Sequence, residues 1–259
     1  MKKIITLPSI LSIDAPTIGL SWYIYFSNVY GIYPNPIYSL IIFGSIWLGY
    51  MSDRLFDSNN LKSKRILSAR HAFALKYFYL IWFIWGIILI SIAGICMFFL
   101  NREKIIACVA LFFIVLLYHL LSQCLLKKSF IKELAVPFIL ALSIHLFLES
   151  ETNITDFFNF SLICFMNCIF LSKVDQKYDA KMGFRSVTHI FKPKTFSYFY
   201  FCVLMYFLFT QSLLINPYII ITIIILFLHI IRIKLSREAI RFFIESSYYL
   251  VPLFFTLCN

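Results

Sequence analysis

Hydrophobic residues dominate the chain in long runs that short polar stretches interrupt. A helix that crosses a bilayer needs about 20 largely apolar residues. Nine runs come close to this length, at residues 9–30, 36–52, 77–99, 105–124, 134–148, 157–173, 196–214, 217–233 and 240–257. The pattern therefore predicts an all-α polytopic membrane protein with nine transmembrane helices.

The basic residues predict the orientation of these spans. All but two of the 23 Lys and Arg residues precede the first run or lie in alternate connections, the exceptions being Arg102 and Lys104. Cytoplasmic loops of membrane proteins are enriched in Lys and Arg. We therefore expect a cytoplasmic N-terminus and a basic face that contacts anionic membrane lipids.

The composition excludes several classes of protein. Hydrophobic residues make up 61% of the chain, which is not typical of a water-soluble domain. The net charge of +11 follows from the loops, and no soluble region interleaves basic and aromatic residues as nucleic-acid binding would require. No small-residue cleavage site follows Met1, so we expect no cleavable signal. The spacing of Cys164 and Cys168 is not completed to a zinc set by nearby Cys or His, so we interpret them as buried apolar residues.

Four of the 12 acidic residues form two D-x-x-x-D patterns, Asp53–Asp57 and Asp175–Asp179, each at the end of an apolar run. Charged residues close to a bilayer are costly and commonly functional. Residues four apart share one helix face, with Cβ atoms about 5–6 Å apart. Two carboxylates this close repel each other unless a cation lies between them or one is protonated. Alone, such a pair is commonly a solvated helix end, but two on the same side favour a divalent-metal site.

The connections that follow the two patterns are the most basic in the chain. Mg²⁺ usually binds one or two carboxylates together with phosphate oxygens of a substrate. Lys and Arg would bind the remaining phosphate charge, and the surrounding apolar helices would hold a long tail. A lipid diphosphate fits this description. The repetition of pattern and basic loop also suggests two halves, about 1–133 and 134–259, of one domain spanning 1–259.

The motifs resemble those of the UbiA superfamily of intramembrane prenyltransferases. Gly49-Tyr-Met-Ser-Asp53-Arg-Leu-Phe-Asp57 is similar to its first signature, and Asp175-Gln-Lys-Tyr-Asp179-Ala-Lys-Met-Gly183-Phe-Arg-Ser186 to its second. Tyr118, followed by Lys127-Lys128 and Lys132-Glu133, is similar to the fourth-span tyrosine and the basic loop after it. The resemblance covers the whole chain in order and spacing.

This resemblance implies a nine-helix bundle around a central cavity, with a lateral opening for lipid tails. Asp53, Asp57, Asp175 and Asp179 would be catalytic ligands of Mg²⁺. The diphosphate of the prenyl donor would be bound by Arg54, Lys127, Lys181 and Arg185, and Tyr118 would lie near the reacting carbon. The implied activity is transfer of a prenyl group, an alkyl group other than methyl, to a lipophilic acceptor.

The chain departs from the family pattern at several positions. Gly49 and Tyr50 stand where the family has Asn-Asp, and the sixth span has Cys168, Leu171 and Ser172 where many members have an Asp and a Tyr-Ala pair. Fewer oxygen ligands remain for metal, and the acceptor stays open. His119 and His145, in apolar runs, are expected to be packed or to form interhelical hydrogen bonds.

Three functions compete on these residues. The first is a prenyltransferase, which we expect in the bacterial inner membrane with its active site facing the cytoplasm. The second is a terpene cyclase that ionises the prenyl diphosphate without an acceptor. The third is a non-catalytic lipid-binding relative, motivated by Gly49 and Tyr50. A transporter is disfavoured because transport sites tend to lie near mid-membrane.

Overall fold

The computed structural model describes residues 7–60, 68–124, 131–148, 152–182, 187–189, 193–211, 216–232 and 235–258. Within these ranges the ordered elements are helices and no strand occurs. Nine of the described helices have 15 to 29 residues: α2 (Asp14–Val29), α3 (Pro36–Asn60), α5 (Phe78–Phe99), α6 (Arg102–Cys124), α7 (Ile131–His145), α8 (Ile154–Met182), α9 (Pro193–Thr210), α10 (Pro217–Ile231) and α11 (Arg237–Cys258). Two shorter elements are α4 (Ala69–Lys76) and the 3-10 turn η2 (Val187–His189). The predicted all-α class is confirmed.

Each of the nine long helices overlaps one of the predicted apolar runs. Within the described ranges, three stretches are long and apolar enough to cross a membrane by length and composition, namely Phe78–Phe99, Arg102–Ser122 and Ile154–Gln176. Two further apolar helices, Thr195–Thr210 and Pro217–Ile231, are shorter. Crossing by the remaining helices and the side on which the N-terminus lies stay predictions.

Proline marks the start of several helices. Pro36, Pro193 and Pro217 are the first residues of α3, α9 and α10. Proline suits this position because the first turn lacks an internal partner for its N–H and φ is already helical. At α10 the Asn216 side chain also accepts a hydrogen bond from the Tyr218 N–H at 2.9 Å. These local signals end the preceding connections and fix where the apolar helices begin.

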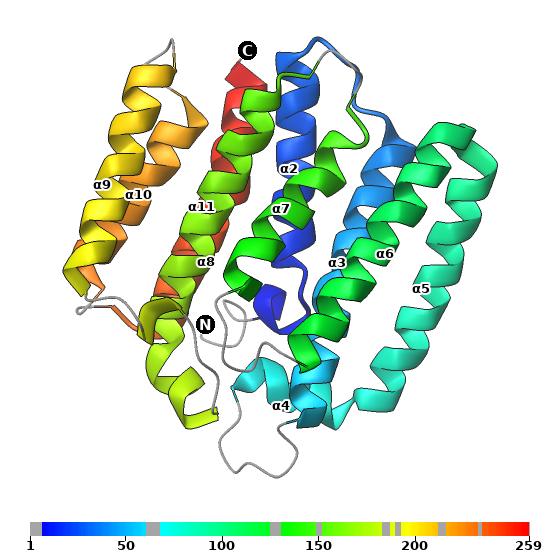
Figure 1. The fold of residues 1–259 in the computed structure, drawn as a ribbon, viewed down its shortest axis with the longest axis horizontal. Helices are drawn as coiled ribbons and strands as arrows, with labels where there is room; N and C mark the ends of the chain where they lie inside the picture. Colours follow the sequence, from blue (N-terminus) through cyan, green and yellow to red (C-terminus); the bar gives the residue numbers. More distant parts are fainter. Residues whose placement is uncertain are drawn as a thin grey trace.

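The helices form one bundle with two flanking pairs (Figure 1). α9 and α10 lie at one edge, and α5 and α6 lie at the other. Between them, α2 packs against α11 and α3, and α7 packs against α8. The short α4 packs against α3 at the end of the bundle opposite the C-terminus. The proposed division into two halves near residue 133 stays a prediction.

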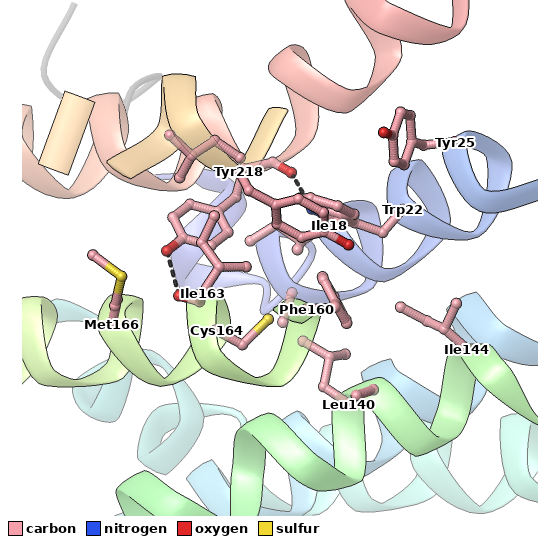
Figure 2. Packing of buried hydrophobic residues seen from close by; sticks show 14 of the residues in the cluster. Ile18, Trp22, Tyr25, Leu140, Ile144, Phe160, Ile163, Cys164, Met166 and Tyr218 are labelled. Atoms are coloured by element: carbon pink, nitrogen blue, oxygen red, sulfur yellow. Dashed lines mark hydrogen bonds between the residues drawn. The ribbon is translucent and has the colours of Figure 1, made fainter. Parts of the chain in front are cut away.

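The packed core lies between α2, α8, α10 and α11. Figure 2 shows Trp22 beside Phe160 and Tyr218, with ring centroids 4.8 Å and 5.1 Å away. The Trp22 indole N–H donates to the Tyr248 carbonyl oxygen at 2.9 Å, and the Tyr248 hydroxyl donates to the Ile163 carbonyl oxygen at 2.5 Å. Buried Trp and Tyr need such partners for their polar atoms. This side of the bundle is therefore filled, in contrast to the side that contains α5 and α6.

Candidate functional site

An apolar cavity of about 660 Å³ lies between α3, α5, α6 and α7. Aliphatic and aromatic side chains form most of its wall, including Trp82 and Trp85 of α5 and Phe112 of α6. Its volume is in the range of cavities that bind small molecules, which are commonly apolar with a few polar groups. The predicted bundle therefore contains a cavity, and this cavity lies toward the α5–α6 edge.

Polar groups gather where the cavity reaches the C-terminal part of α3. Ser52 and Asp53 of α3 and Tyr118 and His119 of α6 line it there. The Tyr118 hydroxyl donates to Asp53 Oδ1 at 3.5 Å. Tyr118 thus lines the cavity beside the first aspartate pattern, and its role near a reacting carbon stays a prediction.

His119 contributes an interhelical hydrogen bond at the same place. Its Nε2 lies 2.8 Å from Ser52 Oγ, and the Ser52 hydroxyl donates to the Gly49 carbonyl oxygen at 2.9 Å. The hydroxyl has a single proton, so the His119 Nε2–H donates to Ser52 Oγ in this arrangement. The expectation of an interhelical hydrogen bond is confirmed for His119. His145 instead contacts the Ala141 carbonyl oxygen within α7, at 3.0 Å.

Asp53 and Asp57 share one cation. Lys132, at the start of α7, places Nζ 2.7 Å from Asp53 Oδ2 and 3.1 Å from Asp57 Oδ2. Burial raises the pKa of Asp57, although Lys132 counteracts part of this shift. Burial alone would lower the pKa of Lys132, but the two carboxylates outweigh it and raise that pKa well above its usual value. The two carboxylates are half-buried and are bridged by a positive charge.

Arg54, between these two aspartates in the sequence, hydrogen-bonds to backbone. Its Nη1 donates to the Ser9 and Ile10 carbonyl oxygens, at 2.5 Å and 3.1 Å, and its side chain is buried. Arg54 therefore joins α3 to the segment that precedes α2. Its predicted contact with a diphosphate stays a prediction. In this structure the guanidinium donates to backbone carbonyl oxygens instead.

Asp175 has a very different environment, because three arginines surround its carboxylate. Arg237 Nε of α11 lies 2.5 Å from Asp175 Oδ1, and Arg70 Nη2 of α4 lies 3.0 Å from Oδ2. Arg241 Nη1 of α11 also pairs with Oδ2, and its Nη2 lies 2.9 Å from Glu245 Oε1. The Asp175 side chain is only 4% exposed. We call Arg70, Asp175, Arg237 and Arg241 the arginine cluster.

The two aspartate patterns lie at the same end of the bundle. α4 packs against α3, which carries the first pattern, and contributes Arg70 to Asp175 on α8. The charge of Arg70 also acts to lower the pKa of Asp57. Gln176 donates to the Thr188 carbonyl oxygen at 2.9 Å and so holds η2 against α8. The common end predicted from the sequence is thus observed, while the membrane side it faces is not tested.

Of four other predicted site residues, two are placed by their backbone alone and two are not placed. Asp179 and Lys181 belong to the last turns of α8, but their side chains lie outside the described residues. Lys127 and Arg185 lie outside the described residues altogether. Their predicted roles stay predictions.

The first pair offers two adjacent carboxylates to a magnesium ion, whereas Asp175 is paired with arginines and its metal role stays a prediction. Mg²⁺ usually takes one or two carboxylates plus phosphate oxygens, and Asp53 and Asp57 are two carboxylates that already share a cation. Both Asp175 oxygens are instead occupied by guanidinium groups. Among the described residues no group of three or more His, Cys, Asp or Glu could hold a metal ion. Metal binding at the first pair would therefore need substrate oxygens as further ligands.

Sequence reasoning missed the partners of both aspartate patterns. Lys132 was assigned only to a basic loop, and Arg70, Arg237 and Arg241 only to the orientation of the spans. The spacing of Arg237, Arg241 and Glu245, four residues apart, does place them on one face of α11. Arg237 and Arg241 are more than 60 residues from Asp175 in the sequence. The contact could not be predicted, because it depends on the packing of α11 against α8.

Comparison with known proteins gives a structural match. A solved structure described as a digeranylgeranylglyceryl phosphate synthase in membranes, a UbiA-family prenyltransferase, aligns over 99% of this chain and 97% of its own, with a TM-score of 0.54 and 17% sequence identity. No protein-family model and no curated protein matches the sequence. The chain therefore shares the fold of a UbiA-family membrane enzyme, and together with its apolar helices this identifies it as an integral membrane protein.

Proposed function

We propose that the protein is an intramembrane prenyltransferase that moves an isoprenyl group from a prenyl diphosphate to a lipophilic acceptor. In enzyme classification this is the transfer of an alkyl group other than methyl. The observation that carries the proposal is the position of Asp53 at the polar end of an apolar cavity of about 660 Å³, with Asp57 joined to it through the shared Lys132. The shared fold with a prenyltransferase supports it.

The diphosphate of the donor would lie against Asp53, Asp57 and Lys132. A bound magnesium ion, held by the two carboxylates, would neutralise charge on the diphosphate. Lys132 would then be released from the carboxylates and would donate to phosphate oxygens as a charge-assisted partner. Lys127, Lys181 and Arg185 are proposed to bind the remaining phosphate charge.

The apolar chain of the donor would extend into the cavity. The allylic C–O bond breaks, the diphosphate leaves with the electron pair, and the allylic carbon forms a bond to the acceptor, which loses a proton. Tyr118 and Phe56 line the polar end, where aromatic faces stabilise developing positive charge. The apolar wall excludes water, which would otherwise compete with the acceptor for the allylic carbon.

The test is magnesium-dependent release of diphosphate from labelled prenyl diphosphates by purified protein, with and without a membrane lipid extract. We expect release in the presence of the extract, together with a new prenylated lipid. Asp53→Asn and Asp57→Asn should each lower the rate by about 100-fold or more, since a metal typically contributes several kcal/mol to such a step.

The matched control is Asp156→Asn. Asp156 is likewise an aspartate near a helix end, but it belongs to α8 and accepts a hydrogen bond from the Tyr30 hydroxyl at 2.5 Å. It lies about 28 Å along α8 from Asp175, and is therefore far from the end of the bundle that carries the aspartate patterns. It should leave the rate unchanged. A cyclic hydrocarbon formed without extract would identify the cyclase instead. Absence of any diphosphate release would favour the non-catalytic lipid-binding relative and contradict the proposal.

The proposed setting is the bacterial inner membrane, with the polar end of the cavity on the cytoplasmic face. The basic connections on that end support this orientation. Cysteine labelling of loop residues in intact cells and in inverted vesicles would test it, and labelling of the aspartate end from outside intact cells would contradict it.

A further inference from the structure

Gly49 leaves space at the point where the cavity meets the first aspartate pattern. It lines the cavity, and a Cβ atom built on it has no heavy atom within 4 Å. It precedes Asp53 by four residues on α3, so the two residues share one helix face. A side chain at position 49 would therefore project into the cavity beside Asp53.

Packing does not explain this glycine, although it explains another glycine of the same helix. A Cβ on Gly44 would lie 2.7 Å from Ile92 Cδ1, so Gly44 permits the close approach of α5 to α3. Gly86 of α5 resembles Gly49 in having nothing within 4 Å, but it does not line the cavity. Gly49 is thus distinguished by the space that it borders.

The cavity follows α3 for several turns. The lining residues of this helix extend from Ile41 to Phe56, and they include Ser45, one turn before Gly49. At 1.5 Å per residue, Gly49 lies about 6 Å and Ser45 about 12 Å from Asp53 along the helix axis, and Ile41 about 18 Å. A chain that leaves the Asp53–Asp57 pair and enters the cavity passes these positions in that order.

We propose that Gly49 and Ser45 determine the length of isoprenoid chain that the cavity accepts, with Gly49 keeping the entrance beside Asp53 open. This inference rests on the proposed function, because it places the diphosphate at Asp53 and Asp57. The ligand class is a single linear chain of isoprene units with an anionic end. A larger side chain at position 49 obstructs the chain near that end, whereas one at position 45 obstructs only longer chains.

The experiment measures binding to purified protein of non-hydrolysable thiodiphosphates carrying dimethylallyl, geranyl, farnesyl and geranylgeranyl chains, with inorganic diphosphate as a probe without a chain. Gly49→Leu should weaken binding of the geranyl and longer probes by about 10- to 100-fold, the effect of a side chain that overfills a packed site. Ser45→Leu should retain the dimethylallyl and geranyl probes and lose the geranylgeranyl probe. Both variants should bind inorganic diphosphate as the unaltered protein does.

The control is Gly86→Leu, the same exchange on a helix surface outside the cavity, which should leave every affinity unchanged.

A photoreactive farnesol, which lacks the diphosphate, reports on the cavity alone and should label the unaltered protein but not Gly49→Leu. If no thiodiphosphate binds while farnesol labelling follows this pattern, the proposed function fails and the role of Gly49 stands. Equal binding or labelling in Gly49→Leu and the unaltered protein would overturn the inference, as would loss of inorganic diphosphate binding together with the chains. If Gly49→Leu does not fold, Gly49→Val and Ser45→Leu decide in the same way.

Discussion

The two aspartate patterns have the same spacing and lie at the same end of the bundle, yet their surroundings differ. Asp53 and Asp57 are half-buried and share a single lysine, and Asp53 borders an apolar cavity. Asp175 is almost fully buried and is paired with arginines from α4 and α11. The carboxylates are alike, so their partners determine what each pattern can do. The first pattern pairs with one lysine beside a cavity, and in the second Asp175 pairs with arginines that join helices.

The reason lies in the number and reach of the cations. One lysine between two carboxylates leaves a net negative charge. A divalent ion in place of the lysine would neutralise both carboxylates. Three guanidinium groups around one carboxylate leave a net positive charge and fill the hydrogen-bonding positions of Asp175. Because these arginines come from two helices, Asp175 joins α4, α8 and α11. In the sequence the second pattern is the closer match to a metal-binding signature, whereas in the structure the first has the accessible carboxylates.

The largest expected effect is on stability. Asp175→Asn removes the nearly buried counter-charge of three half-buried arginines, of which Arg241 still pairs with Glu245, and should lower the free energy of unfolding by about 3–5 kcal/mol. Asp53→Asn should lower it by about 1 kcal/mol or less, because Lys132 keeps Asp57 as a partner in a half-buried setting. Thermal unfolding of detergent-solubilised protein in EDTA measures both without a contribution from metal.

A matched double variant sharpens this test. Arg70→Met removes a charge whose printed ion pair is with Asp175, so adding it to Asp175→Asn should recover part of the loss. Equal stability of the Asp175→Asn and Asp53→Asn proteins would contradict the structural role of Asp175. It would also restore the two patterns to equal standing as metal-site candidates.

The next effect is on metal affinity at the first pair. Lys132→Met removes the cation that bridges Asp53 and Asp57. The two carboxylates then repel each other unless another cation binds, so Mn²⁺ should bind about 10-fold more tightly. Titration calorimetry with Mn²⁺ alone measures this. Lys104→Met is the control, since Lys104 pairs with the Tyr38 hydroxyl at 3.0 Å and not with a carboxylate. An unchanged Mn²⁺ affinity in Lys132→Met would show that the pair is not the cation site.

The helices were predictable because their signals are local. Apolar runs and the prolines at 36 and 217 depend on neighbouring residues, so the element order follows from the sequence. Which residues meet Asp175 depends on helix packing between α4, α8 and α11, and no periodicity encodes that contact. Lys132 was similarly hidden, since it reaches Asp57 from a helix that begins more than 70 residues later. The sequence thus identified Asp53 and Asp57 as candidate site residues, but it did not identify Lys132 as the residue that pairs with them.

The smallest expected effect is the pH dependence of stability at α4, the helix that connects the surroundings of the two patterns. His71 of α4 is buried next to Arg70, with Nδ1 2.7 Å from Ser68 Oγ. Burial, assisted by the charge of Arg70, lowers the pKa of His71 from its ordinary value of 6.5 to about 3. The unfolded chain therefore binds a proton at a higher pH than the folded protein does.

The contribution of His71 to stability is full well above pH 6.5 and is lost as the pH falls toward 3, by about 0.7 kcal/mol between pH 7 and pH 6. His71→Asn, which does not titrate, should lose less over this interval in thermal unfolding. Because α4 supplies Arg70 to Asp175 and also packs against α3, acid weakens the surroundings of both patterns through this residue. An identical pH dependence in the variant and the unaltered protein would rule out His71 as the origin of such acid sensitivity.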